Sequence, residues 1–156
     1  MLQKLDVADS VRRELSPRTA RKHKAEFGQF MTPSGVARFM ASLFPPSTMK
    51  TCRLLDAGAG VGALSCAFLD RWLVGEFGFE SVEATAYEID KKLCGHLAKH
   101  LTGYRRVTPR IIEGDYIELA TAEGLQDRGY THAILNPPYK NINCKSAHRQ
   151  ALRTVC

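Results

Sequence analysis

Short apolar runs alternate with segments of helical periodicity along most of this chain. Four such runs predict β-strands, at residues 52–56, 82–87, 110–113 and 132–135. The segments between them predict helices over 63–74 and 90–101 and a helical turn over 116–122. Alternation of this kind favours an α/β fold with a parallel, doubly wound sheet. The loops that follow the strands then lie at one edge of the sheet, where ligands bind.

The first fifty residues predict helices without strands. Ser16 and Pro17 are typical of a helix start, so a basic helix is expected from Ser16 to Phe27. A second helix is expected near Thr32, with Thr32 as its N-cap and Pro33 at its first position. Its apolar residues fall at helical spacing, at Val36, Phe39, Met40 and Leu43.

The composition indicates one ordinary globular domain. The chain has 156 residues, and its 44% hydrophobic content is enough to build a core. No apolar run approaches the ~20 residues needed to cross a bilayer, and the N-terminus lacks the apolar centre of a secretory signal. A cytoplasmic protein with no membrane partner is therefore expected.

The charge is concentrated at the two ends. Residues 1–30 carry seven Lys or Arg and four Asp or Glu, residues 31–139 carry eleven and twelve, and residues 140–156 carry four and none. Basic ends could approach a phosphate backbone, and simple solvation explains them equally well.

The cysteines argue against a disulfide framework. There are five, at positions 52, 66, 94, 144 and 156, and none forms a C-x-x-C pair. An odd number of this kind is typical of reduced thiols, and no metal site is predicted.

A glycine loop follows the first predicted strand and opens a helix. Gly58 and Gly60 allow close approach of the backbone to a ligand. The spacing Gly58-x-Gly60-x-x-Ala63 also fits a dinucleotide fingerprint, so a nicotinamide or flavin enzyme is a rival. Asp56 at the strand end favours a cationic ligand, because a carboxylate is poorly placed beside a pyrophosphate. The run Asp-x-Gly-x-Gly-x-Gly resembles the first motif of methyltransferases that use S-adenosylmethionine (SAM).

The second and third strand ends carry acids that suit a nucleoside. Glu88 can accept hydrogen bonds from ribose hydroxyls, Ile89 could pack on the cofactor adenine, and Asp90 is expected to cap the next helix. Asp115 resembles the third-motif acid of the same family, which accepts a hydrogen bond from the adenine amino group. Tyr116 could lie against that ring.

The segment Asn136-Pro137-Pro138-Tyr139 follows the last predicted strand. Two prolines make a stiff loop that presents carbonyl acceptors, and Asn136 adds a side-chain carbonyl. The Asn136 and Pro137 carbonyls could hold both hydrogens of an amino group on a planar ring, favouring a pyramidal nitrogen. Tyr139 could stack on the base, a contact worth ~1–3 kcal/mol. The segment resembles the fourth motif of amino methyltransferases.

The fourth motif also occurs in enzymes that methylate protein glutamine or RNA guanine. Residues 28–37 decide between them, because they resemble the segment before the glycine loop in gamma-class N6-adenine DNA methyltransferases of the restriction–modification type. Phe30, Thr32 and Pro33 match the positions that close over the methionine part of SAM. The resemblance spans residues 28–139. It implies a Rossmann-like SAM-dependent methyltransferase fold, SAM as cofactor, and double-stranded DNA with a flipped adenine as substrate.

The resemblance also implies an arrangement of segments. We expect a basic helical segment over residues 1–30, a SAM-binding core over 31–139 and a basic tail over 140–156. The family continues with further strands and a target-recognition domain, whereas this chain ends 17 residues after Tyr139. The expectation is a sheet truncated after the fourth strand, in a fragment, a truncated reading frame or one half of a split enzyme. Such a chain lacks a recognition domain or partner and is expected in a bacterial-type cytoplasm near the nucleoid. A methyltransferase of protein glutamine or RNA, and a non-catalytic SAM-binding module, remain alternatives.

Overall fold

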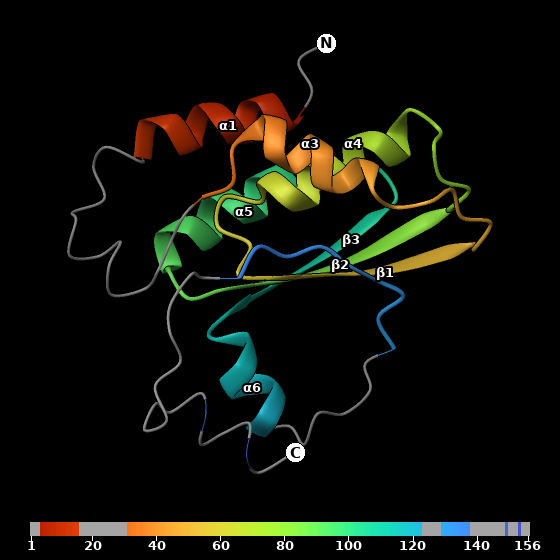
Figure 1. The fold of residues 1–156 in the computed structure, drawn as a ribbon. Coiled ribbons are helices and arrows are strands. Elements are labelled where there is room, and N and C mark those ends of the chain that lie inside the picture. The colour runs from red at the N-terminus through yellow and green to blue at the C-terminus, as the bar shows by residue number, and fades with distance from the viewer. Residues whose placement is uncertain (1–3, 16–30, 123–128, 138–148, 150–152, 154–156) are drawn as a thin grey trace.

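The computed structural model describes residues 4–15, 31–122 and 129–137, together with Arg149 and Arg153. Its helices and strands follow in the order α1 (Lys4–Leu15), α3 (Ser34–Ser42), β1 (Thr51–Ala57), α4 (Ala63–Leu73), β2 (Ser81–Glu88), α5 (Lys91–Thr102), β3 (Val107–Glu113), α6 (Tyr116–Ala122) and β4 (His132–Ala133) (Figure 1). The helix predicted over 16–27 lies outside the described residues.

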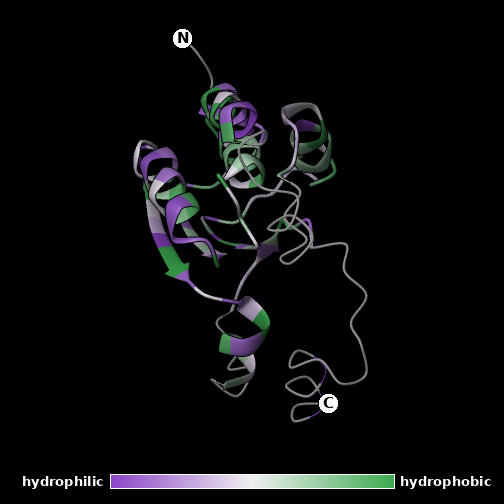
Figure 2. Cartoon of the chain, turned by 90° about the vertical axis from the view of Figure 1, so that its left-hand side faces the viewer, coloured by the Kyte–Doolittle hydropathy of each residue, from purple (hydrophilic) through white to green (hydrophobic). Residues whose placement is uncertain are grey.

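The four strands form one parallel sheet in the order β3-β2-β1-β4. From β1 to β3 the chain moves steadily in one direction, so α4 and α5 lie on the same face of the sheet. The step to β4 returns across the sheet, and α6 lies on the opposite face (Figures 1 and 2). The predicted α/β fold with a doubly wound parallel sheet is confirmed. Strand order reverses between β1 and β4, so the loops after these two strands flank the switch point where such sheets bind ligands.

The core lies between the sheet and the larger helix layer. Nine of the eleven residues of α4 are buried, because this helix packs between the sheet and helices α1 and α3. Phe68 of α4 is fully buried, and its ring lies 4.9 Å from that of Phe77 between centroids. Burial of such a side chain is worth roughly 1.5–3 kcal/mol, which fixes α4 and hence the glycine loop before it.

Helix α3 differs from its prediction in its start and in its buried face. It begins at Ser34, and the N-cap is Pro33, which makes no side-chain cap bond, so the assignment of Thr32 as N-cap is wrong. Three apolar residues expected to face the core are instead exposed, Val36 by 46%, Phe39 by 63% and Leu43, the C-cap, by 66%. Two alanines are the buried residues of the helix, Ala37 and Ala41. Such small side chains let α3 approach α4 closely.

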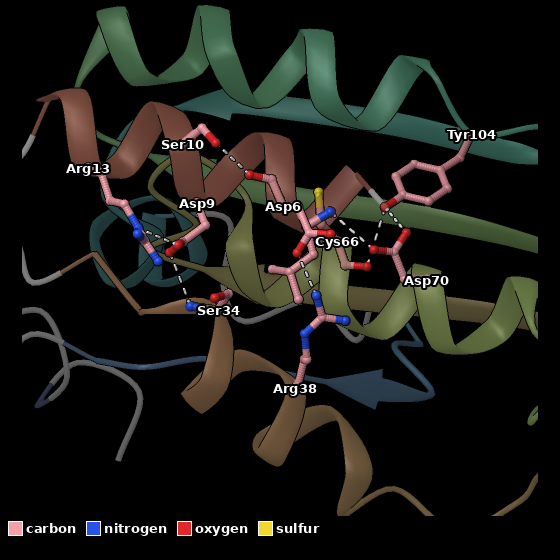
Figure 3. A network of polar contacts seen from close by, with 10 residues as sticks. Asp6, Asp9, Ser10, Arg13, Ser34, Arg38, Cys66, Asp70 and Tyr104 are labelled. Carbon is pink, nitrogen blue, oxygen red and sulfur yellow. Dashed lines mark hydrogen bonds and ion pairs between the residues drawn. The ribbon is translucent and has the colours of Figure 1, made fainter. Parts of the chain in front are cut away.

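Helix α1 lies within the helical segment expected over residues 1–30, although the sequence placed a helix only over 16–27 of it. Polar contacts anchor α1 to helices α4 and α3 (Figure 3). The backbone N–H of Leu5 donates to Asp70 Oδ2 on α4 (3.0 Å), and Tyr104 after α5 donates to Asp70 Oδ1 (2.7 Å). Asp9 accepts a hydrogen bond from the backbone N–H of Ser34 at the start of α3 (3.2 Å). Leu5 and Ala8 are fully buried, so α1 belongs to the same core.

Asp9 is expected to stabilise the fold through its charge. Arg12, which donates to its carboxylate at 2.7 Å, is the main cause that lowers the Asp9 pKa to about 2, against the opposing effect of burial. A carboxyl whose pKa is lower in the folded state stabilises the fold above its unfolded value of 3.8 and loses this contribution as the pH falls toward 2. Asp9→Asn should therefore lower the free energy of unfolding by about 2 kcal/mol at pH 7. Urea unfolding followed by circular dichroism at pH 7, 5 and 3.5 should show the difference shrinking below pH 4.

The matched control is Asp6→Asn. The Asp6 carboxylate also pairs with an arginine, Arg38 on α3, but its side chain is 40% exposed. An exposed pair of this kind contributes at most ~1 kcal/mol. Equal losses in the two variants would contradict the role given to Asp9.

Candidate functional site

The glycine loop between β1 and α4 needs glycine for its conformation. Gly58, Gly60 and Gly62 all have positive φ, at 87°, 58° and 86°, a region that L side chains rarely adopt. The N–H groups of Gly58 and Ala59 donate to the Tyr87 carbonyl of β2 (3.0 and 2.9 Å), which ties the loop to the neighbouring strand end. A Cβ added at Gly58 would meet no atom of the described segments within 4 Å. The loop is therefore open on the side of Gly58.

Glu88 holds the glycine loop from the end of β2. Its Oε2 accepts a hydrogen bond from the Gly60 N–H (2.7 Å), and its Oε1 accepts one from the Asp90 N–H (2.8 Å). The side chain is buried, and this burial raises the Glu88 pKa. Ile89, the next residue, is 38% exposed. Asp90 caps α5 as predicted, through bonds from the N–H groups of Lys92 and Leu93.

Asp56 lies behind the glycine loop and is fully buried. Its Oδ2 accepts hydrogen bonds from the Ser65 N–H (3.2 Å) and hydroxyl (2.6 Å) in the first turn of α4. Its Oδ1 has no hydrogen-bond partner within the part of the chain that the structure describes. Burial, opposed by Ser65 and reinforced by the Glu88 carboxylate, raises the Asp56 pKa to about 7. A buried carboxylate in this state favours a nearby positive charge.

The segment before α3 lies between the two loops at the switch point. The Cγ of Met31 is 3.7 Å from the position of a Cβ added at Gly60, so Met31 covers the glycine loop. Thr32 is buried, and its Oγ1 accepts a hydrogen bond from the Asn136 side-chain amide (3.2 Å). The Ile134 N–H donates to the Leu55 carbonyl (2.9 Å), which sets the chain before Asn136 beside β1. Residues 104 apart in sequence are thus brought into contact.

The last two predicted cofactor-binding residues, Asp115 and Tyr116, follow the end of β3. Asp115 Oδ1 accepts from the N–H groups of Ile117 (2.8 Å) and Glu118 (3.1 Å), so this side chain caps α6. The Tyr116 ring lies edge-on to that of Tyr87, with centroids 5.0 Å apart. The Gly114 N–H donates to the Glu88 carbonyl (2.9 Å), which places the β3 loop beside the end of β2.

The structure therefore gathers most of the predicted site residues at one edge of the sheet, around the ends of its four strands. Phe30, Pro138 and Tyr139 lie outside the described residues, whereas Pro137 is exposed directly after Asn136. Sequence reasoning missed two contacts that shape the glycine loop. One is that of Ser65 with Asp56, and the other is the 2.7 Å contact of His100 Nδ1 on α5 with the Val61 carbonyl. No motif marked either residue.

The described residues hold neither a metal-binding cluster nor a membrane-spanning helix. No group of three His, Cys, Asp or Glu side chains there could hold a metal ion. No helix there is both long and apolar enough to cross a membrane. Cys52 and Cys66 are buried free thiols, and burial raises their pKa values to about 11 and 12.

A parallel sheet of this order, with a glycine loop after β1 and an acid at the end of β2, defines a Rossmann-like methyltransferase fold. A solved structure described as the modification subunit of a type I restriction enzyme from Vibrio vulnificus YJ016 shares this fold. It is 21% identical, with a TM-score of 0.60, over 88% of this chain and 28% of that one.

Two curated relatives give a closer sequence match. The type II methyltransferase M.BsuBI of Bacillus subtilis is 38% identical over 98% of this chain and 32% of its own length. The type II methyltransferase M.PstI of Providencia stuartii is 33% identical over 96% of this chain and 31% of its own length. No family model matches the sequence. The sequence is similar to these two type II methyltransferases over nearly its whole length, as its motifs predict, and it spans about a third of the length of the curated relatives it matches.

Proposed function

We propose that this chain binds the cofactor and the target base of a SAM-dependent DNA methyltransferase, and that the methyl acceptor is the N6 amino group of adenine. The observation that carries the proposal is the position of Asn136, at the switch point and in contact with Thr32 beside the glycine loop. The names of the two relatives, both type II methyltransferases, support the same class of reaction.

The residues around the glycine loop fit SAM better than a dinucleotide. The buried Oδ1 of Asp56, which no hydrogen-bond donor of the described residues reaches, favours a positive charge nearby, and the open side of Gly58 leaves room for a ligand. A pyrophosphate over this loop would lie near the buried carboxylate of Asp56, which disfavours a further negative charge. The chemistry of this loop therefore argues against the nicotinamide or flavin rival.

Each residue that would hold the cofactor has a distinct part. Asp56 would stabilise the positively charged end of SAM electrostatically and without direct contact, since its side chain is fully buried behind the loop. Glu88 would accept the ribose hydroxyls with its carboxylate oxygens, which also accept the N–H groups of Gly60 and Asp90. The half-exposed side chain of Ile89 would pack against the adenine ring, with Asp115 and Tyr116 on its far side. Thr32 and Pro33, with Phe30, would border the methionine part.

The protein's part in the reaction is mainly to position the methyl acceptor. When bound, SAM supplies a methyl group that is already activated, so positioning the acceptor carries most of the catalysis. An adenine amino group is a poor nucleophile, because its lone pair is delocalised into the ring. The side-chain carbonyl of Asn136 and the backbone carbonyl of Pro137 would accept its two hydrogens and favour a pyramidal nitrogen. Pro138 would stiffen this loop and Tyr139 would stack on the base.

Methyl transfer from labelled SAM by the full-length protein tests the proposal. Unmethylated duplex DNA, RNA and a protein extract are offered in parallel, and the labelled product is digested and separated. We expect label in N6-methyladenine from DNA. Label in cytosine, in RNA or in protein glutamine would overturn the substrate, and so would a folded protein that binds SAM but labels none of them. Asn136→Ala serves as the inactive control.

A further inference from the structure

Thr32 has a buried hydroxyl that its local structure does not use. A threonine just before a helix usually bonds to the first turn of that helix. Here Pro33 occupies the N-cap position, and the Ser34 N–H donates instead to Asp9 of α1 (3.2 Å), a contact drawn in Figure 3. The Thr32 hydroxyl is thereby available to accept the Asn136 amide at 3.2 Å.

This contact fixes the orientation of the Asn136 side-chain amide, that is, the directions in which its carbonyl and its NH₂ group point. An asparagine amide carries a carbonyl acceptor on one side and an NH₂ donor on the other. With its NH₂ group on Thr32 Oγ1, the Oδ1 carbonyl points away from Thr32. The reversed amide would offer donors to a substrate that also brings donors, and the two would repel.

We propose that Thr32 is a positioning residue, which orients the Asn136 amide so that its carbonyl receives the amino group of the substrate. This inference rests on the proposed function and adds to it a residue that acts through Asn136.

The surroundings of Thr32 hold it in place for this role. The fixed φ of Pro33 (−64°) restricts the chain on one side, and Met31 packs over Gly60 on the other. The Asp9 carboxylate, held by Arg12 (2.7 Å) and Arg13 (2.8 Å), sets the start of α3. Helix α1 therefore fixes the segment that carries Thr32.

The first test compares Thr32→Val with Thr32→Ser in the full-length protein. Valine keeps the shape of threonine without its hydroxyl, whereas serine keeps the hydroxyl. We expect Thr32→Val to lower the single-turnover rate of methyl transfer about tenfold, the size of one lost hydrogen bond, with SAM affinity changed less than about twofold. Thr32→Ser should restore the rate to within about threefold. The matched control is Thr102→Val, which removes an exposed hydroxyl bonded to the Ala98 carbonyl on α5 and should leave the rate unchanged.

Nuclear magnetic resonance can detect the contact between Thr32 and Asn136 without measuring methyl transfer. The side-chain NH₂ signals of Asn136 in ¹⁵N-labelled protein, identified by their loss in Asn136→Asp, should shift in Thr32→Val and stay near their positions in Thr32→Ser. An unshifted amide in Thr32→Val would overturn the contact, and a shifted amide with an unchanged transfer rate would overturn the positioning role. Equal losses of SAM affinity and rate would leave Thr32 with its contact to the methionine part of SAM alone and overturn the positioning role. If adenine is not methylated, the proposed function fails, while the amide signals still decide whether Thr32 orients Asn136.

Discussion

Asn136→Ala should remove methyl transfer almost completely, by at least 10²-fold at saturating SAM, which is the usual cost of losing a preorganised group aimed at the reacting centre. The side chain is half-buried, and within the described residues its one hydrogen bond is to Thr32. Its loss should therefore cost little stability. SAM affinity should change less than about threefold, because the residues proposed to hold the cofactor lie in other loops.

Single-turnover transfer and calorimetric titration with SAM measure the two quantities separately. Asn136→Asp is the informative companion, since a carboxylate keeps acceptor oxygens for the substrate and can take a hydrogen bond from the Thr32 hydroxyl. It should retain more of the rate than alanine does. If SAM affinity falls as far as the rate in Asn136→Ala, then Asn136 serves the cofactor and its proposed role is wrong.

The strands could be predicted because a buried parallel sheet shows as short apolar runs, and the errors lie at its edges. Strand β3 begins at Val107, three residues before its prediction, and includes Pro109. A proline usually argues against a strand, but β3 lies at the edge of the sheet, where a missing N–H is tolerated. Strand β4 pairs only with Leu54 and Leu55 of β1, so it is shorter than its apolar run suggests.

Apolar periodicity predicts that a helix is present but does not determine which of its faces is buried. Apolar spacing placed a helix near α3, yet Val36, Phe39 and Leu43 face outward and the alanines face inward, because close packing on α4 favours the smallest side chains. Helix α1 falls in the helical segment expected over residues 1–30, but its bounds were not predicted, for a related reason. Its position depends on Asp70, Tyr104 and Ser34, which are contacts between distant parts of the chain.

The candidate site could be located because a parallel sheet brings the carboxyl ends of its strands to one edge, so motifs far apart in sequence must meet there. The orientation of each side chain could not be predicted. The Asp56 side chain accepts a hydrogen bond from Ser65 in the protein interior. The Thr32 side chain binds Asn136 and does not cap α3. Both outcomes depend on which neighbour offers the better hydrogen bond after folding.

Asp56→Asn should strengthen the fold while it weakens cofactor binding. The buried carboxyl has a pKa of about 7 against an ordinary 3.8, so between these values the folded state holds a proton that the unfolded state has released. Stability therefore falls as the pH rises from 4 toward 7, and at pH 8 the ionised carboxylate costs stability. Asparagine keeps the acceptor for Ser65 without this charge, and the free energy of unfolding at pH 8 should rise by roughly 1–3 kcal/mol. The control is Asp90→Asn, which exchanges one good helix cap for another and should leave the free energy of unfolding nearly unchanged.

The affinity for SAM should move in the opposite direction. A cation bound over the glycine loop favours the carboxylate form of Asp56, so binding releases a proton and strengthens as the pH rises toward 7. Between pH 5.5 and 7, below the ordinary pKa of an α-amino group, the Kd should fall roughly tenfold in the wild-type protein. The loss of this slope in Asp56→Asn, with weaker binding at pH 7, would assign the linkage to Asp56. If the slope persists, the linked proton belongs to another group, and Glu88, whose buried carboxylate holds the Gly60 N–H, becomes the residue to replace next.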